Sequence, residues 1–117
     1  MSEGEERPWG RWDTLHAEPG YKVKVLRVKP GARLSYQTHA RRSERWTVAR
    51  GEALVTLDAK DFRLPVGAML EVPLGAAHRL ANPGASELVV VEVQLGDYLG
   101  EDDIRRLSDD YGRAGAS

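Results

Sequence analysis

Glycine and proline recur at short intervals along this chain, and they separate segments that are short and rich in valine and leucine. The separators lie at positions 19–20, 30–31, 51, 65–67, 73–75 and 83–84. Turn residues spaced in this way are typical of antiparallel sandwiches and barrels, because each tight turn reverses a short strand. The sequence therefore predicts an all-β fold whose strands include residues 21–28, 45–49, 53–57, 69–72 and 88–94.

Length and charge narrow the class of protein. A chain of 117 residues is long enough for one domain, which we place at residues 7–113 between flexible tails at 1–6 and 114–117. The net charge of -1 gives no basic surface for nucleic acid, and no segment has the length of a membrane span. The acidic start does not resemble a secretory leader, so we expect a cytoplasmic protein without nucleic-acid or membrane partners.

One short helix is expected near the C-terminal end. Residues 101–103 are acidic, and two arginines follow at 105 and 106. Negative charge in the first turn and positive charge in the last turn both stabilise a helix through its dipole. We predict a helix of about two turns over residues 101–107, laid over the end or edge of the barrel.

Two spacing patterns contain the candidate metal ligands. The first runs from Gly31 to Gly51 and contains Gln37, His39 and Glu44, and the second runs from Gly67 to Asn82 and contains His78. The absence of cysteine excludes thiolate ligands and cysteine nucleophiles. Nitrogen and oxygen donors of this kind suit a divalent first-row metal, provided that the two segments lie on facing strands. The predicted metal ligands are Gln37, His39, Glu44 and His78.

Both patterns resemble the two cupin motifs, with Gln37 at a position that is more often histidine. Four flanking blocks, at residues 7–10, 20–24, 28–35 and 96–104, resemble the type II mannose-6-phosphate isomerase cupin domain. This domain is often fused behind a sugar-nucleotide pyrophosphorylase, whose activity we do not expect from these residues. The resemblance implies a small cupin barrel (a double-stranded β-helix, or jelly roll) that binds one divalent metal. Zinc is favoured, and manganese, cobalt, nickel or iron would also fit.

The same resemblance implies the interconversion of mannose 6-phosphate and fructose 6-phosphate through a cis-enediolate, with a phosphosugar or other small molecule as substrate. Glu92 interrupts an apolar segment, so we assign it as the general base. Arg79 follows His78 and is assigned to catalysis and phosphate binding. Further substrate-binding candidates are Lys22, Lys24 and Gln94.

The chain departs from the family beside its first motif. Ala40, Arg41 and Arg45 stand where the family usually has histidine. The metal ligands survive this change, but an acid–base group is lost, because arginine stays protonated. Arg41 and Arg45 would instead bind an anion or pair with Glu44 or Asp58.

Two alternative functions therefore stay open beside the isomerase. One is a non-catalytic metal-binding or sugar-binding cupin. The other is a different metal-dependent cupin enzyme, such as a dioxygenase or another sugar isomerase or epimerase. Barrels of this kind often pair through an edge strand or an exposed apolar face, so we also predict a homodimer.

Overall fold

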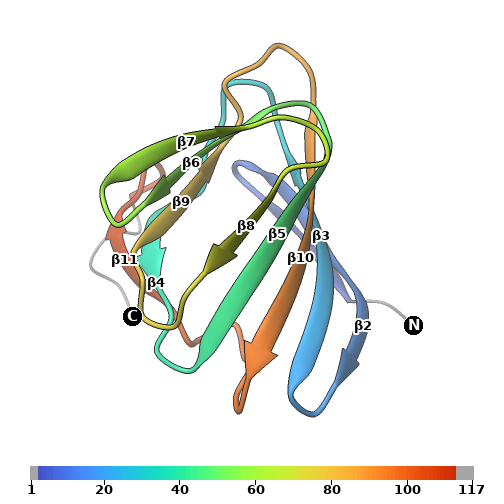
Figure 1. The fold of residues 1–117 in the computed structure, drawn as a ribbon, viewed down its shortest axis with the longest axis vertical. Coiled ribbons are helices and arrows are strands. Elements are labelled where there is room, and N and C mark those ends of the chain that lie inside the picture. The colour runs from blue at the N-terminus through green and yellow to red at the C-terminus, as the bar shows by residue number, and fades with distance from the viewer. Residues whose placement is uncertain (1–2, 113–117) are drawn as a thin grey trace.

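The computed structural model describes residues 3–112, which form two antiparallel sheets packed face to face (Figure 1). The six-stranded sheet contains, in spatial order, β1 (Gly4–Arg7), β2 (Gly10–Glu18), β3 (Tyr21–Val28), β10 (Leu88–Gly96), β5 (Arg42–Arg50) and β8 (Met69–Val72). The five-stranded sheet contains β11 (Arg105–Ser108), β4 (Tyr36–Thr38), β9 (His78–Ala81), β6 (Ala53–Leu57) and β7 (Lys60–Leu64). The predicted all-β fold is confirmed, and β3, β6 and β8 have the predicted bounds.

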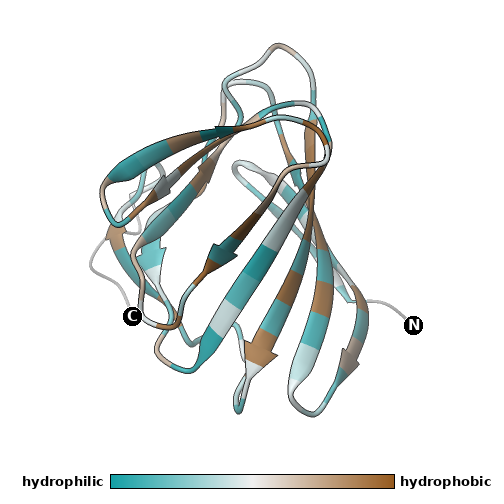
Figure 2. Cartoon of the chain, in the orientation of Figure 1, coloured by the Kyte–Doolittle hydropathy of each residue, from teal (hydrophilic) through white to brown (hydrophobic). Residues whose placement is uncertain are grey.

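Burial alternates along the long strands, as the pleat requires. In β5 the residues at 42, 44, 46 and 48 are buried and their neighbours are more exposed. Figure 2 shows the corresponding bands of hydrophilic and hydrophobic residues along β3, β5 and β10. The pattern of the sequence therefore sets which side chains of each strand enter the space between the sheets.

The core contains three tryptophans and ten aliphatic side chains. It consists of Trp9, Trp12, Leu26, Val28, Trp46, Val48, Ala53, Val55, Val72, Ala76, Leu80, Leu88 and Val90. Burial of each large apolar side chain stabilises the fold by about 1.5–3 kcal/mol. Close backbone packing supports the same core at Gly10, where a Cβ atom would lie 1.9 Å from the carbonyl oxygen of Arg27.

The N-terminal region differs from the predicted tail over residues 1–6. Gly4–Arg7 forms strand β1, which pairs with β2 in the register Glu5↔Trp12 and Glu6↔Arg11. Glu6 also contacts Arg11, with 2.8 Å between Oε1 and Nη1. Edge pairing of this kind uses backbone groups and surface charges, so it leaves no apolar signal in the sequence. The predicted tail at 114–117 lies outside the described residues.

The predicted helix over residues 101–107 is wrong, because Arg105–Ser108 forms strand β11 beside β4. The acidic residues have tertiary partners instead of a helix dipole. Glu101 pairs with Lys24, and the carboxylate of Asp103 accepts the backbone N–H groups of Ala40 and Arg41 at 2.9 and 3.0 Å. A helix of two turns gains little by itself, so these contacts decide the conformation.

Across residues 3–112 the structure contains no helix with the length and apolar character that a membrane crossing needs.

Candidate metal centre

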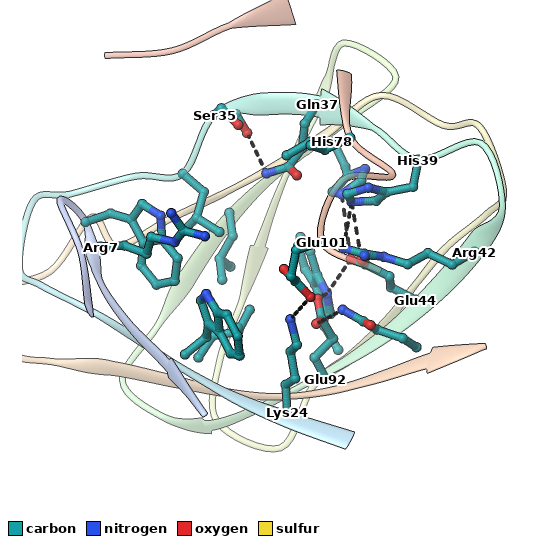
Figure 3. A pocket seen from close by; sticks show the side chains of 18 of the residues that line it. Arg7, Lys24, Ser35, Gln37, His39, Arg42, Glu44, His78, Glu92 and Glu101 are labelled. Carbon is teal, nitrogen blue, oxygen red and sulfur yellow. Dashed lines mark hydrogen bonds and ion pairs between the residues drawn. The ribbon is translucent and has the colours of Figure 1, made fainter. Parts of the chain in front are cut away.

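A pocket opens between the two sheets, and side chains from both sheets line it (Figure 3). The polar end of β5 supplies Arg42 and Glu44, and β10 supplies Glu92 and Gln94. The segment that follows β10 adds Glu101 and Ile104 at the border of the pocket. The cavity of about 80 Å³ holds several water-sized molecules, since one such molecule needs about 10–15 Å³ by the same measure.

Strand register brings the predicted ligands together. β4 pairs with β9 through Gln37↔His78, and β5 lies opposite in the other sheet with Glu44 facing inward. One ligand atom each from His39, Glu44 and His78 lies within 4.8 Å of the other two, and all three residues are buried. His39 Nε2 lies 3.3 Å from Glu44 Oε2, and His78 Nε2 lies 3.6 Å from Glu44 Oε1.

Backbone carbonyl groups orient both histidines. His39 Nδ1 lies 2.6 Å from the carbonyl oxygen of Asp103, and His78 Nδ1 lies 3.0 Å from that of Ala76. A carbonyl oxygen only accepts, so Nδ1 carries the proton in each ring and Nε2 keeps its lone pair. This is the arrangement found around metal-ligating histidines, whose second nitrogen is held by an outer hydrogen bond.

Burial keeps both rings neutral. Desolvation, together with the positive charge of Arg42 and the neighbouring His78, lowers the pKa of His39 to about 4. Burial also lowers the pKa of His78. Two imidazole lone pairs and a carboxylate therefore face one another, and a cation between them relieves the repulsion. The donor set fits a divalent metal such as zinc.

Gln37 also lies in the pocket wall and is 9% exposed. Its Nε2 donates to the carbonyl oxygen of Ser35 at 3.3 Å. With the amide nitrogen directed to the backbone, Oε1 is the atom that suits a metal.

Glu92 and Gln94 lie in the pocket wall, as predicted from the polar interruption of their strand. Glu92 accepts from Trp46 Nε1 at 3.0 Å and from Gln94 Nε2 at 2.8 Å. Burial, and then the nearby charge of Glu44, raise the pKa of Glu92 to about 7. Gln94 Oε1 is buried without a hydrogen-bond partner among the described residues.

The two predicted lysines behave differently. Lys24 borders the pocket at 2% exposure, with its Nζ 3.9 Å from the centre of the Trp12 ring and paired with Glu101. Lys22 Nζ donates to the carbonyl oxygen of Leu99 at 3.0 Å and is not among the residues that line the pocket.

Arg79 is not brought to the pocket. Its Nε donates to the carbonyl oxygen of Leu34 at 2.9 Å, and its Nη2 donates to that of Ser108 at 3.2 Å. Neighbours on a strand point to opposite faces, so Arg79 leaves the pocket when His78 enters it. The assignment of Arg79 to catalysis and phosphate binding is therefore corrected.

Arg41 and Arg45 pair with surface carboxylates and not with Glu44 or Asp58. Arg41 Nε lies 3.2 Å from Asp97 Oδ1, and Arg45 Nη2 lies 3.8 Å from Glu71 Oε2. Both arginine side chains are more than half exposed. The predicted pairing with Glu44 or Asp58 is therefore wrong.

Arg42 is the most consequential site residue that sequence reasoning missed. It shares parity with Glu44 and Trp46 on the inward face of β5, and that alternation was the available signal. Burial lowers the pKa of Arg42, but attraction by Glu44, Glu92 and Glu101 outweighs burial and raises it. Glu101, which lines the pocket, and Asp103, whose carbonyl group holds His39, were missed because only the course of the chain after β10 brings them to these places.

Comparisons with known proteins identify the family. Residues 2–109 match the family described as Mannose-6-phosphate isomerase C-terminal. The chain is 51% identical over 107 residues to the alginate biosynthesis protein AlgA of Pseudomonas aeruginosa, covering 92% of this chain and 22% of that protein. It is 46% identical over 107 residues to a mannose-1-phosphate guanylyltransferase of Klebsiella pneumoniae, covering 92% and 23%.

A solved structure supports the fold. The cupin domain of Schizosaccharomyces pombe Cnp3 aligns with a TM-score of 0.72 at 20% identity, over 74% of this chain and 64% of that one. At this identity the likeness concerns the fold alone. The chain spans about a quarter of the length of the curated relatives named above.

The comparisons correct the predicted reaction. The sequence favoured interconversion of mannose 6-phosphate and fructose 6-phosphate, but a relative at 46% identity is named for a different reaction, as a mannose-1-phosphate guanylyltransferase. The isomerase prediction is overturned by this finding, and the name of that relative and the description of the family both refer to a mannose phosphate. With the family match over nearly its whole length, the chain belongs to the mannose-6-phosphate isomerase C-terminal family and has a cupin fold.

Proposed function

We propose that this domain binds one divalent metal ion through His39, Glu44 and His78 and binds a mannose phosphate in the pocket beside it. The observation that carries the proposal is the geometry of the two histidines. Each has its Nδ1 bonded to a backbone carbonyl, and each directs Nε2 at a different oxygen of Glu44. Two imidazole lone pairs that converge on one carboxylate, with each ring held by an outer hydrogen bond, match the arrangement of metal-ligating histidines.

Zinc is the metal that we propose first, with Gln37 as an additional oxygen donor. Imidazole and carboxylate donors suit zinc, and manganese, cobalt, nickel and ferrous iron accept the same atoms. When bound, the metal would supply positive charge that attracts ligand oxygens. Ser35 and Asp103, which hold Gln37 and His39 through carbonyl groups, would keep the donors in place.

The ligand class rests on the relatives and on the pocket wall. A relative that is 46% identical to this chain over 107 residues is named for mannose 1-phosphate. Gln94 Oε1, buried without a partner among the described residues, offers an acceptor for a sugar hydroxyl group. Lys24 borders the same cavity and provides a donor. These groups support a hydroxylated, phosphorylated ligand of small size.

The test is calorimetric titration of chelator-treated protein with zinc, manganese and cobalt, followed by mannose 1-phosphate and mannose 6-phosphate. We expect one metal per chain, and sugar-phosphate binding that is much weaker before metal is added. His78→Ala should lose the metal. His16→Ala is the matched control, because His16 is exposed and lies outside the pocket lining.

Two results would contradict the proposal. Metal binding that is equal in wild type and His78→Ala would place the ion elsewhere. If the protein binds one metal ion per chain but neither sugar phosphate, the proposed ligand is wrong and only the metal-binding role stands. Circular dichroism of both variants distinguishes loss of a ligand from loss of the fold.

A further inference from the structure

Arg42 lies against the atoms that we assign to the metal (Figure 3). Its Nε donates to Glu44 Oε2 at 2.8 Å, and its Nη2 lies 3.3 Å from His39 Nε2. The side chain is 7% exposed, and Nη1 is buried without a hydrogen-bond partner among the described residues. A guanidinium group thus contacts two of the three proposed ligands.

The contact of Arg42 with His39 and a metal ion bound to His39 exclude each other. His39 Nδ1 is committed to the carbonyl oxygen of Asp103, so Nε2 has one lone pair to give. Arg42 Nη2–H and a metal ion both need that lone pair. In addition, two cations at this separation repel strongly inside a protein. Arg42 must therefore withdraw from His39 whenever a metal binds there.

A withdrawn guanidinium still needs an anion beside it, because arginine stays protonated when buried. Glu92 and Glu101 attract it, but Glu92 already accepts hydrogen bonds from Trp46 and Gln94, and Glu101 pairs with Lys24. Glu44 would then share its charge with the metal, and Nη1 already lacks a partner. An oxyanion such as phosphate matches the planar fork of a guanidinium and can accept two hydrogen bonds from it. The pocket that contains Arg42 is the one proposed for a phosphorylated ligand.

We propose that Arg42 is a built-in competitor of the metal, and that metal binding releases its guanidinium to bind the oxyanion of the ligand. The inference rests on the proposed function, since it takes His39, Glu44 and His78 as the metal ligands. It adds a coupling: metal and oxyanion each strengthen the binding of the other.

The first experiment compares zinc affinities of wild type, Arg42→Gln and Arg41→Gln by competition with a chromogenic chelator. Arg42→Gln should bind zinc about tenfold more tightly, a change equivalent to about 1.4 kcal/mol, because the competitor is gone. Arg41→Gln is the matched control, since the neighbouring Arg41 side chain is 53% exposed and pairs with Asp97. Unchanged or weaker zinc binding by folded Arg42→Gln would overturn the inference.

The first comparison of the second experiment needs wild type alone. The zinc affinity of wild type is measured in sodium sulfate and in sodium chloride of equal ionic strength. Sulfate should raise it by about fivefold or more, the usual size of such coupling, and should have no such effect on Arg42→Gln. Equal affinities of wild type in the two salts, or an equal sulfate effect in Arg42→Gln, would overturn the coupling. A wild type that binds no zinc would instead refute the proposed function itself.

Discussion

The two ends of the space between the sheets are equally buried but chemically opposite. At one end β5 and β10 contribute Val48 and Val90, which are 1% and 0% exposed. At the other end the same strands contribute Glu44 and Gln94, which are also 1% and 0% exposed. Strand alternation therefore sets which positions are buried, and residue type sets whether the buried side chains form an apolar core or a polar pocket.

Burial of side chains lowers the free energy of the folded state at the apolar end and raises it at the polar end. Apolar side chains gain free energy when they leave water, whereas buried carboxylate and amide groups lose it unless they find partners. Most polar groups at the site have partners, such as the Trp46 N–H that donates to both Glu44 and Glu92. The polar end is thus held by the apolar end and by its own hydrogen bonds, and it is arranged for binding at some expense in stability.

The largest effect on stability is expected from a substitution at the apolar end. Leu88 is 0% exposed and belongs to the apolar cluster. Leu88→Ala should lower the free energy of unfolding by about 2–5 kcal/mol, through lost burial and a cavity. Urea unfolding measures this change. The zinc affinity of the remaining folded protein should stay at its wild-type value, and a large loss of zinc affinity would mean that the two ends are not separable.

Metal binding at the polar end should stabilise the folded state as a whole. With free zinc at about one hundred times the dissociation constant, the free energy of unfolding should rise by about 2.7 kcal/mol, because the unfolded chain lacks the assembled ligands. Thermal unfolding with and without zinc checks this. The same addition should leave His78→Ala unchanged, and a zinc-dependent rise in that variant would count against the assigned ligands.

The segment after β10 should hold the metal ligand His39 in place without contacting the metal itself. Asp103 accepts two backbone N–H groups, from Ala40 and Arg41, and its carbonyl group holds His39. Asp103→Ala loosens this segment, so zinc affinity should fall by about tenfold, as for other outer-shell changes. Asp102→Ala is the control, since Asp102 contacts Tyr98 at the surface. Equal affinities of the two variants would contradict this role.

The smallest effect concerns pH and the pair between Lys24 and Glu101. Burial raises the pKa of Glu101, but the charges of Lys24, Arg42 and Lys22 outweigh it, and the pKa is lowered from 4.5. A carboxyl group with a lowered pKa in the folded state stabilises the fold above its ordinary pKa and loses that contribution as pH falls.

Wild type should therefore lose more stability than Glu101→Gln between pH 7 and pH 3.5. The two proteins should differ at pH 7 and converge in acid. Urea unfolding at both pH values measures the difference. A difference that grows in acid would show that the Glu101 carboxylate does not carry the contribution.

Much of this architecture was predictable from local pattern. The bounds of β3, β6 and β8 follow from alternation and from flanking turn residues, both of which are properties of short segments. The strands β4, β9 and β11 were missed because each has only three or four residues and at most two of them are apolar, whereas β8, which is equally short, has three apolar residues. The helix prediction failed because the acids of residues 101–103 are satisfied by distant partners, which a local pattern does not contain.

The amino-acid sequence by itself determined the all-β fold, the alternation of buried positions, and the identity of His39, Glu44 and His78 as chemically related residues. These features depend on residue type and spacing, which are properties of the sequence itself. The tertiary structure alone decided that Lys24 borders the pocket while Lys22 does not, that Glu101 lines it, and that the carbonyl group of Asp103 holds His39. Those outcomes depend on which strands pair and in which register, and register is set by the packing of the whole chain.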